Sequence, residues 1–180
     1  MKMRFLLPVL ATGFILAGCE SNAIKEPTYA DAKNNQFIPT NREAADVLVA
    51  QLGNRVTAPN TLIIASLVNV DKLEESSTLG RIVAEQVSAG FTKHGFRMQE
   101  LKLRSNIYVQ NNGGEFLLTR EVEELAEAHR APAVVVGSYA TSREFVYINL
   151  KVIHPKSNVV LAVHDYALPL DSNNRRMLRN

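Results

Sequence analysis

Two continuous apolar runs limit what this chain can fold into. Residues 62–69 read LIIASLVN, and residues 133–140 read AVVVGSYA. A strand that is buried on both faces has such a run because neither face meets water, and strands of this kind occupy the middle of parallel sheets. The sequence therefore predicts a sheet with a parallel centre that helices cover.

Helical spacing of apolar residues separates these runs. Thr40 and Glu43 have the spacing of a capping box, at the start of a helix that Gly53 ends. Two further helices are predicted, one from about Leu79 to Gly95 and one over residues 120–130. Because helices link the strands, we expect right-handed crossovers between parallel strands.

The last part of the body has a different pattern. Residues 145–152 alternate between apolar and other side chains, and residues 159–168 are predicted to pair back on them as a hairpin. With a further strand over 96–103, the element order is αβαβαβββ. The predicted fold class is α/β, with one mixed sheet and α+β character at the C-terminal end. The alternation predicts that one face carries Val146, Ile148, Leu150 and Val152, and that the other carries Phe145, Tyr147, Asn149 and Lys151.

The first 19 residues have the layout of a secretory signal. Lys2 and Arg4 precede an apolar stretch, Phe5 to Leu16. As a helix this stretch would span roughly 18 Å, which is too short for a bilayer core of ~30 Å. The following residues, LAGC, end at Cys19 and resemble the bacterial lipobox. The alternative is an ordinary secreted protein that has a cysteine near its cleavage site.

The lipobox resemblance implies a membrane anchor. Residues 1–18 would be cleaved, and Cys19 would carry a diacylglycerol and an N-acyl chain, with palmitate as an expected acid. Several acyl chains hold a protein firmly, whereas one chain binds marginally. Glu20 is not the aspartate that favours inner-membrane retention, so the resemblance implies the periplasmic face of the outer membrane. No other cofactor is implied.

Polar segments flank the predicted body. Residues 19–39 contain the lipidated cysteine and a flexible tether, the body spans 40–170, and 171–180 form a loose polar tail. Within the body, residues 104–115 form a long connection. Removal of Lys2 and Arg4 reduces the 20 basic side chains to 18, which balance the 18 acidic ones. This neutral balance argues against binding to nucleic acid.

The sequence contains no pattern that predicts catalysis or metal binding. It has a single cysteine and lacks the GxSxG and HExxH motifs. His94 and His129 lie near predicted helix C-termini, where a cation meets the negative end of the helix dipole. His164 and Asp165 are neighbours on a strand, so they point to opposite faces and do not form a dyad. We expect neither catalytic residues nor a metal site, and a periplasmic hydrolase is the enzyme alternative.

Two surfaces are candidates for contact with a protein partner. Tyr147, Asn149 and Lys151 place an aromatic side chain among polar ones, which is common at interfaces. Tyr108 lies in the long connection, and long loops are often functional. The alternative for Tyr147, Asn149 and Lys151 is that they form an ordinary solvent-exposed face of their strand.

Most of the body resembles the FlgO family of outer-membrane lipoproteins, which are linked to the bacterial flagellum. The matching stretches are NREAADVLVAQL (41–52), LIIASLVNVDKLEESSTLGRIVAEQVSAGF (62–91), GEFLLTREVEELA (114–126), AVVVGSYA (133–140), VYINLKVI (146–153) and VVLAVHDYALPL (159–170). The resemblance implies a non-enzymatic accessory protein at the outer membrane beside the flagellar basal body. It would support motility through contacts with companion flagellar outer-membrane or periplasmic proteins, and self-association is left open.

The element order is also similar to small periplasmic domains, such as the amino-terminal domain of TolB and the lipoprotein activators of penicillin-binding proteins. This likeness implies an alternative function, the activation of a peptidoglycan synthase. The tether is short for an activator that must reach across the periplasm, because about 20 flexible residues span only roughly 25 Å.

Overall fold

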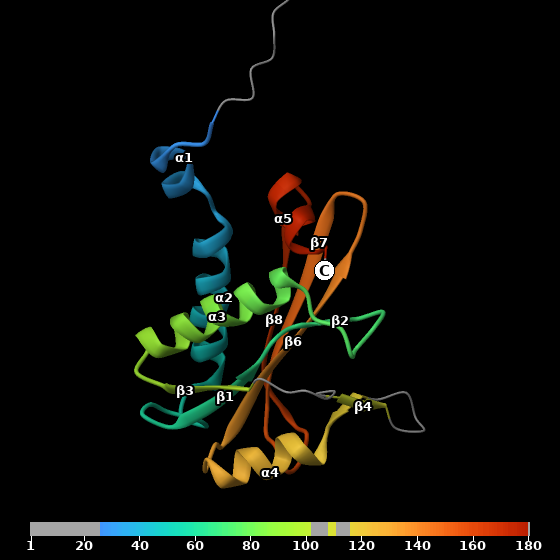
Figure 1. Cartoon of the computed structure of the whole chain (residues 1–180). Coiled ribbons are helices and arrows are strands. Elements are labelled where there is room, and N and C mark those ends of the chain that lie inside the picture. Colours follow the sequence, from blue (N-terminus) through green and yellow to red (C-terminus); the bar gives the residue numbers. More distant parts are fainter. Residues whose placement is uncertain (1–25, 102–107, 111–115, 180) are drawn as a thin grey trace, which may run out of the picture. The chain divides into compact units, whose positions relative to one another are not determined.

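The computed structural model describes residues 26–101, 108–110 and 116–179 (Figure 1). The chain divides into two compact units, Met1–Asn34 and Asn35–Asn180. The two units are described separately below.

The described part of the first unit contains a short helix, α1 (Tyr29–Asn34), without a buried residue. The Asp31 carboxylate accepts hydrogen bonds from the Thr28 hydroxyl (2.7 Å) and from the Thr28 backbone N–H (2.9 Å). These bonds stabilise the charged carboxylate and lower the pKa of Asp31. Part of the tether expected over residues 19–39 is helical, in α1 and from Phe37 onward in α2.

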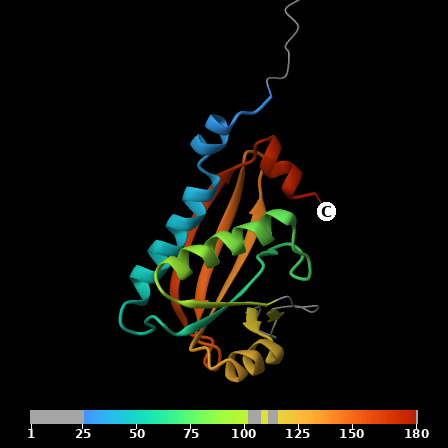
Figure 2. The same cartoon turned by 60° about the vertical axis from the view of Figure 1, so that its left-hand side comes forward.

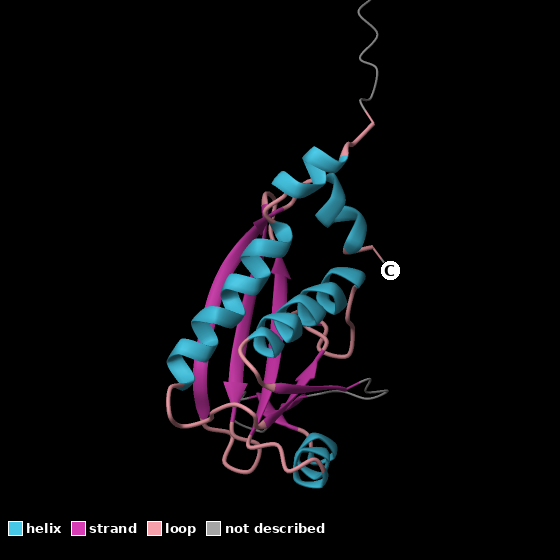
Figure 3. Cartoon of the chain, turned by 90° about the vertical axis from the view of Figure 1, so that its left-hand side faces the viewer, coloured by secondary structure: helices cyan, strands magenta, loops and turns pink. Residues whose placement is uncertain are grey.

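The second unit is built on one mixed sheet (Figure 3). Its strands are β1 (Thr61–Ala65), β2 (Val68–Asn69), β3 (Arg97–Leu101), β6 (Ala133–Thr141), β7 (Phe145–Ile153) and β8 (Val160–Pro169). The order is β3-β1-β6-β7-β8, and β2 pairs separately with β6. β1 is parallel to β3 and to β6, whereas β7 is antiparallel to both of its neighbours, β6 and β8. The predicted mixed sheet with a parallel centre is confirmed.

The strand predicted over 62–69 is interrupted, which corrects the sequence interpretation. β1 ends at Ala65, and β2 begins at Val68. Between them, the Leu67 backbone N–H donates to the Gly80 carbonyl (3.3 Å), and the Leu67 carbonyl accepts from the Ser76 hydroxyl (2.7 Å). The backbone of this apolar run thus forms hydrogen bonds with the loop and helix that follow it. The hydrophobicity of the run alone does not reveal the break.

Two helices, α2 (Phe37–Leu52) and α3 (Thr78–Lys93), cover one face of the sheet (Figure 3). They approach each other closely at Gly90, where a Cβ would lie 2.5 Å from the Ala45 Cβ. The Ser77 side chain caps α3 by accepting from the Gly80 N–H (3.1 Å), as a serine at this position should. The capping box predicted at Thr40 is wrong, because α2 already begins at Phe37 and Gln36 precedes it.

The opposite face of the sheet is covered in part by α4 (Arg120–Ala128). Val122 and Ala126 of this helix pack with Ile63 of β1 and with Val134 and Ile153 of the following strands. The helix predicted over 120–130 is confirmed. These contacts reach β1, the start of β6 and the end of β7, so the rest of this face has no helix over it among the described residues.

Two other segments differ from the expectation. The predicted connection over 104–115 contains a strand, β4 (Tyr108–Gln110), that pairs antiparallel with β5 (Phe116–Leu118). The tail predicted to be loose forms a helix, α5 (Ser172–Met177). Asp171 caps it by accepting from the Asn174 N–H (2.8 Å), and the buried Asn174 side chain donates to the Pro169 carbonyl (2.7 Å). Short polar segments of this kind have little apolar periodicity to reveal them.

The outer edge of β8 is partly closed by a side chain from α2. The Gln51 Nε2 donates to the Val163 carbonyl (2.8 Å), and the Gln51 Oε1 accepts from the Val163 N–H (3.1 Å). One amide side chain therefore satisfies both backbone groups of an edge residue.

Candidate functional site

The part of the sheet that α4 leaves uncovered forms a surface that we call the open face. It consists of Phe145, Tyr147, Asn149 and Lys151 of β7 and Val163, Asp165 and Ala167 of β8. The pairing places Tyr147 opposite Ala167, Asn149 opposite Asp165, and Lys151 opposite Val163. Since residues opposite each other in a sheet share a face, these side chains form one continuous surface.

The open face exposes several large apolar side chains to water. The exposed fractions are 53% for Tyr147, 41% for Phe145 and 41% for Val163. The Phe145 and Tyr147 rings contact each other with centroids 6.4 Å apart. Exposed aromatic and aliphatic side chains that cluster in this way are typical of surfaces that bind another protein.

A shallow groove of about 530 Å³ crosses this face. Its lining comes from three strands and the loop after β2: Val70, Ser138, Ala140, Tyr147, Ile148, Asn149, Asp165, Tyr166 and Ala167. Most of these atoms belong to apolar groups or to the sheet backbone. The groove can therefore hold an apolar side chain of a partner, with a few polar groups around it that set the orientation.

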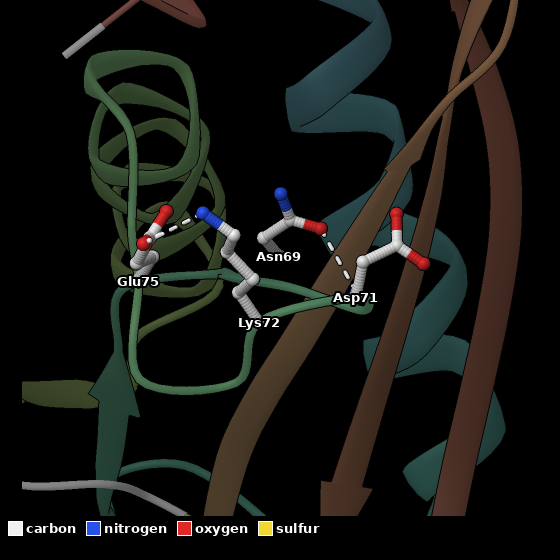
Figure 4. Close-up of polar contacts among 4 residues, drawn as sticks. All are labelled: Asn69, Asp71, Lys72 and Glu75. Atoms are coloured by element: carbon white, nitrogen blue, oxygen red, sulfur yellow. Dashed lines mark hydrogen bonds and ion pairs between the residues drawn. The ribbon is translucent and has the colours of Figure 1, made fainter.

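One wall of the groove is a loop whose shape is fixed by local hydrogen bonds (Figure 4). The Asn69 Oδ1 accepts from the Asp71 N–H at 2.9 Å, and Lys72 pairs with Glu75 at 3.1 Å. The Val70 N–H donates to the Tyr139 carbonyl of β6 (3.0 Å), and Val70 itself is 44% exposed. The loop thus presents an apolar side chain beside the sheet in a defined position.

Two of the polar side chains of the open face contact each other. The Asn149 Nδ2 donates to the Asp165 Oδ1, so these two side chains hold each other across the strands. Lys151 forms no ion pair with any described residue. A lysine and a paired carboxylate beside aromatic rings can recognise a complementary protein surface, but they do not form a nucleophile with its base.

The structure brings together three of the four candidate partner residues. Tyr147, Asn149 and Lys151 share the open face, as the alternation predicts. Tyr108 lies on β4, in the separate two-stranded sheet. Cys19 lies outside the described residues.

Residues of β8 complete the open face, and the sequence analysis did not select them. The alternation in residues 159–168 could have identified Val163 and Asp165 as outward-facing. The register that places them beside Tyr147 and Asn149 required the structure.

The histidines have the structural positions that the sequence predicts. His94 and His129 follow the last residues of α3 and α4. The His94 Nε2 lies 2.6 Å from the Asp46 Oδ1, which joins α3 to α2 at the surface. His164 and Asp165 point to opposite faces, since His164 stacks on Tyr166 while Asp165 binds Asn149.

A buried polar cluster behind the sheet was missed by the sequence analysis. Asn41 of α2 is fully buried, and its Nδ2 donates to the Gln86 Oε1 of α3 (2.6 Å). The Tyr166 hydroxyl of β8 donates to the Asn41 Oδ1 (2.5 Å). The cluster fixes both helices against the last strand, and no motif in the sequence marks it.

Tyr166→Phe is expected to lower the free energy of unfolding by about 1–2 kcal/mol, because the Asn41 Oδ1 would stay buried without its hydrogen-bond donor.

Burial raises the pKa of the Tyr166 phenol above its usual range. The folded state therefore keeps this proton where the unfolded chain loses it, and stability falls as the pH rises above about 10. Urea denaturation at neutral pH and above pH 10 measures both effects.

Tyr147→Phe is the matched control for this prediction, since the same hydroxyl is removed from an exposed ring on the neighbouring strand. Equal stability of the two variants would contradict the role of the buried cluster.

Among the described residues, no three His, Cys, Asp or Glu side chains are close enough to hold a metal ion. No helix in the same ranges is both long and apolar enough to cross a membrane.

Comparisons with known proteins identify a family and a fold. The family model described as "FlgO protein" matches residues 42–173. No curated protein matches the sequence.

Among solved structures, the LpoB C-terminal domain from Escherichia coli is similar with a TM-score of 0.52 and 12% identity, over 74% of this chain and 98% of that one. The same domain from Salmonella enterica gives a TM-score of 0.47 with 12% identity, over 69% and 94% of the two chains. The PelC dodecamer from Paraburkholderia phytofirmans gives 0.44 with 10% identity, over 68% and 83%. At these identities, the likeness to the Escherichia coli domain establishes the fold alone.

Proposed function

Because the chain belongs to the FlgO family, we propose that it is a non-enzymatic lipoprotein of the outer membrane that supports flagellar motility by binding another protein of the flagellar envelope. Acylated Cys19 would hold it at the periplasmic face of that membrane. The open face would bind the partner.

The observation that carries this proposal is the uncovered, apolar part of the sheet. Sheets in soluble domains usually bury an apolar face under helices or a second sheet. Here Phe145, Tyr147 and Val163 stay exposed on the sheet beside a groove. A protein partner that covers them would gain about 25 cal/mol for each Å² of apolar surface removed from water.

A complementation experiment tests the role of the open face. In a strain that lacks the gene, we expect Tyr147→Glu to restore little swimming, because a carboxylate would replace the exposed ring in the middle of the interface. Loss of such a central aromatic contact typically weakens binding by about 2 kcal/mol or more. Swimming radius in soft agar and the number of attached filaments are measured.

Tyr29→Glu is the matched control, since Tyr29 is 96% exposed on α1 and does not belong to the open face. It should restore swimming as well as the unchanged protein does, at equal protein levels. Equal restoration by Tyr147→Glu would refute the binding role of the open face, and normal swimming of the deletion strain would refute the flagellar function.

The second candidate function is activation of a peptidoglycan synthase. The same observation supports it, because an apolar open face fits a synthase as well as a flagellar protein. Cross-linking of the acylated protein in envelopes of flagellated cells separates the two. Recovery of flagellar proteins supports the first function. Recovery of a penicillin-binding protein, with faster glycan cross-linking in vitro, supports the second.

A further inference from the structure

Three arginines at the C-terminal end of the chain form a strongly basic surface that the proposed function does not use. Arg175, Arg176 and Arg179, here called the α5 arginines, line a surface hollow of about 560 Å³. The remaining lining residues, Leu170, Ser172 and Asn173, carry no charge.

The described residues around the α5 arginines do not pair with their charges. The Arg175 Nη2 donates to the Leu170 carbonyl (3.3 Å), which is an uncharged acceptor. None of the three forms an ion pair with a carboxylate of the described residues. All three side chains are exposed, so the guanidinium donors of Arg176 and Arg179 and the remaining donors of Arg175 can face a ligand. Three adjacent unpaired cations repel each other, and an external anion removes this repulsion.

The α5 arginines lie at the end of the Asn35–Asn180 unit where its chain begins. α5 directly follows β8, and the Tyr166 hydroxyl near the end of β8 is bonded to Asn41 in the second turn of α2. Figure 2 shows the start of α2 and α5 at the same end of this unit, and Figures 1 and 3 agree. α4 lies at the other end (Figure 1).

This position relates the α5 arginines to the proposed anchor. Cys19 precedes the unit by 16 residues in the sequence, so an acyl group on Cys19 would attach the unit to a membrane through the end that carries the arginines. We propose that the α5 arginines bind the phosphate groups of an anionic phospholipid surface, and that this contact turns the basic end of the unit toward the membrane. The proposal rests on the acylation of Cys19, which sets the end of the unit that faces the membrane. It concerns a contact with lipid, which the proposed flagellar function does not include.

The guanidinium groups of the hollow favour the phosphate groups of a lipid surface over a free phosphate ion. A guanidinium group binds phosphate oxygens with two parallel hydrogen bonds, which gives both strength and orientation. A single free ion in an open, exposed hollow would stay hydrated, whereas an array of headgroups engages several arginines together. Each arginine near an anionic membrane contributes about fivefold in affinity, and such basic groups reinforce acyl anchors.

The test measures vesicle binding without the acyl chains. The chain from residue 19 onward, with Cys19→Ser, is sedimented with vesicles of phosphatidylglycerol and phosphatidylethanolamine, and separately with phosphatidylcholine vesicles. We expect binding to the anionic vesicles only. Arg176→Gln combined with Arg179→Gln should weaken it roughly 30-fold. Arg175 is left unchanged because it also binds the Leu170 carbonyl.

The matched control is Arg97→Gln combined with Arg120→Gln. It removes the same charge from exposed arginines on β3 and α4. This control should bind the anionic vesicles as the parent chain does, with an unchanged unfolding midpoint for both double variants.

Three results would overturn the proposal: no binding to anionic vesicles, an equal loss in both double variants, or binding of the α5 arginines to inorganic phosphate with the same affinity as to vesicles. None of them bears on the acylation of Cys19 or on swimming, which are measured separately.

Discussion

Leu150→Asp is expected to unfold most of the protein at room temperature. Leu150 is fully buried on β7, on the face that α2 and α3 cover. A carboxylate there has no partner, and an uncompensated buried charge costs about 3–5 kcal/mol. The lost packing of the leucine adds about 2–5 kcal/mol. Because a domain is typically stable by only about 5–15 kcal/mol, the sum approaches the whole stability. Urea denaturation followed by circular dichroism measures the effect.

Val163→Asp is the control for this prediction. It introduces the same carboxylate on the adjacent strand, but on the open face, where Val163 is 41% exposed and lies opposite Lys151. The free energy of unfolding should change by less than about 1 kcal/mol, as for most surface substitutions. If Leu150→Asp were as stable as Val163→Asp, the assignment of the two sheet faces would be wrong.

Cys19→Ser is expected to move the protein from the membrane fraction to the soluble fraction of the periplasm. Each buried CH₂ group of an acyl chain contributes about 0.8 kcal/mol to membrane binding, and a serine hydroxyl cannot accept the thioether-linked lipid. The whole anchor is therefore lost in one substitution. Fractionation of cells without detergent, with a high-salt wash that releases any contact of the α5 arginines with phospholipid, measures the change together with metabolic labelling by a fatty acid.

Ser21→Ala provides the comparison for the anchor, since it changes a hydroxyl two residues away and leaves the thiol in place. This variant should stay in the membrane fraction and incorporate the label. A Cys19→Ser protein that is still labelled by the fatty acid would contradict the anchor.

Segments with one dominant signal were predictable from the sequence. The apolar run at 133–140 corresponds to β6, the alternation at 145–152 to β7, and the stripe that begins at Leu79 to α3. In each case burial of one face, or of both, imposes a periodicity that the residues must follow. The four residues of the open face on β7 followed from the same rule.

The features that the sequence did not reveal depend on pairing between distant segments. The break after Ala65 is set by hydrogen bonds from the Leu67 backbone to Gly80 and Ser76. The hydrophobicity of a residue does not reveal which group its backbone binds. The contribution of β8 to the open face depends on the register of two strands. A polar helix such as α5 is stabilised by its cap and by the burial of Asn174, so an apolar stripe was not needed.

The Gln51 side chain on the edge of β8 has a consequence if acylated Cys19 concentrates the protein on a membrane surface, as we propose. Neighbouring molecules at a membrane would meet repeatedly, and the unpaired backbone groups of an edge strand can then pair with the edge strand of another molecule. The Gln51 amide forms both hydrogen bonds that an additional strand would form with the backbone of Val163. The backbone groups of this edge residue are thus paired within the same molecule. Where Cys19 anchors the protein to a membrane, this contact would hinder the pairing of a neighbouring strand at Val163, while the open face stays available.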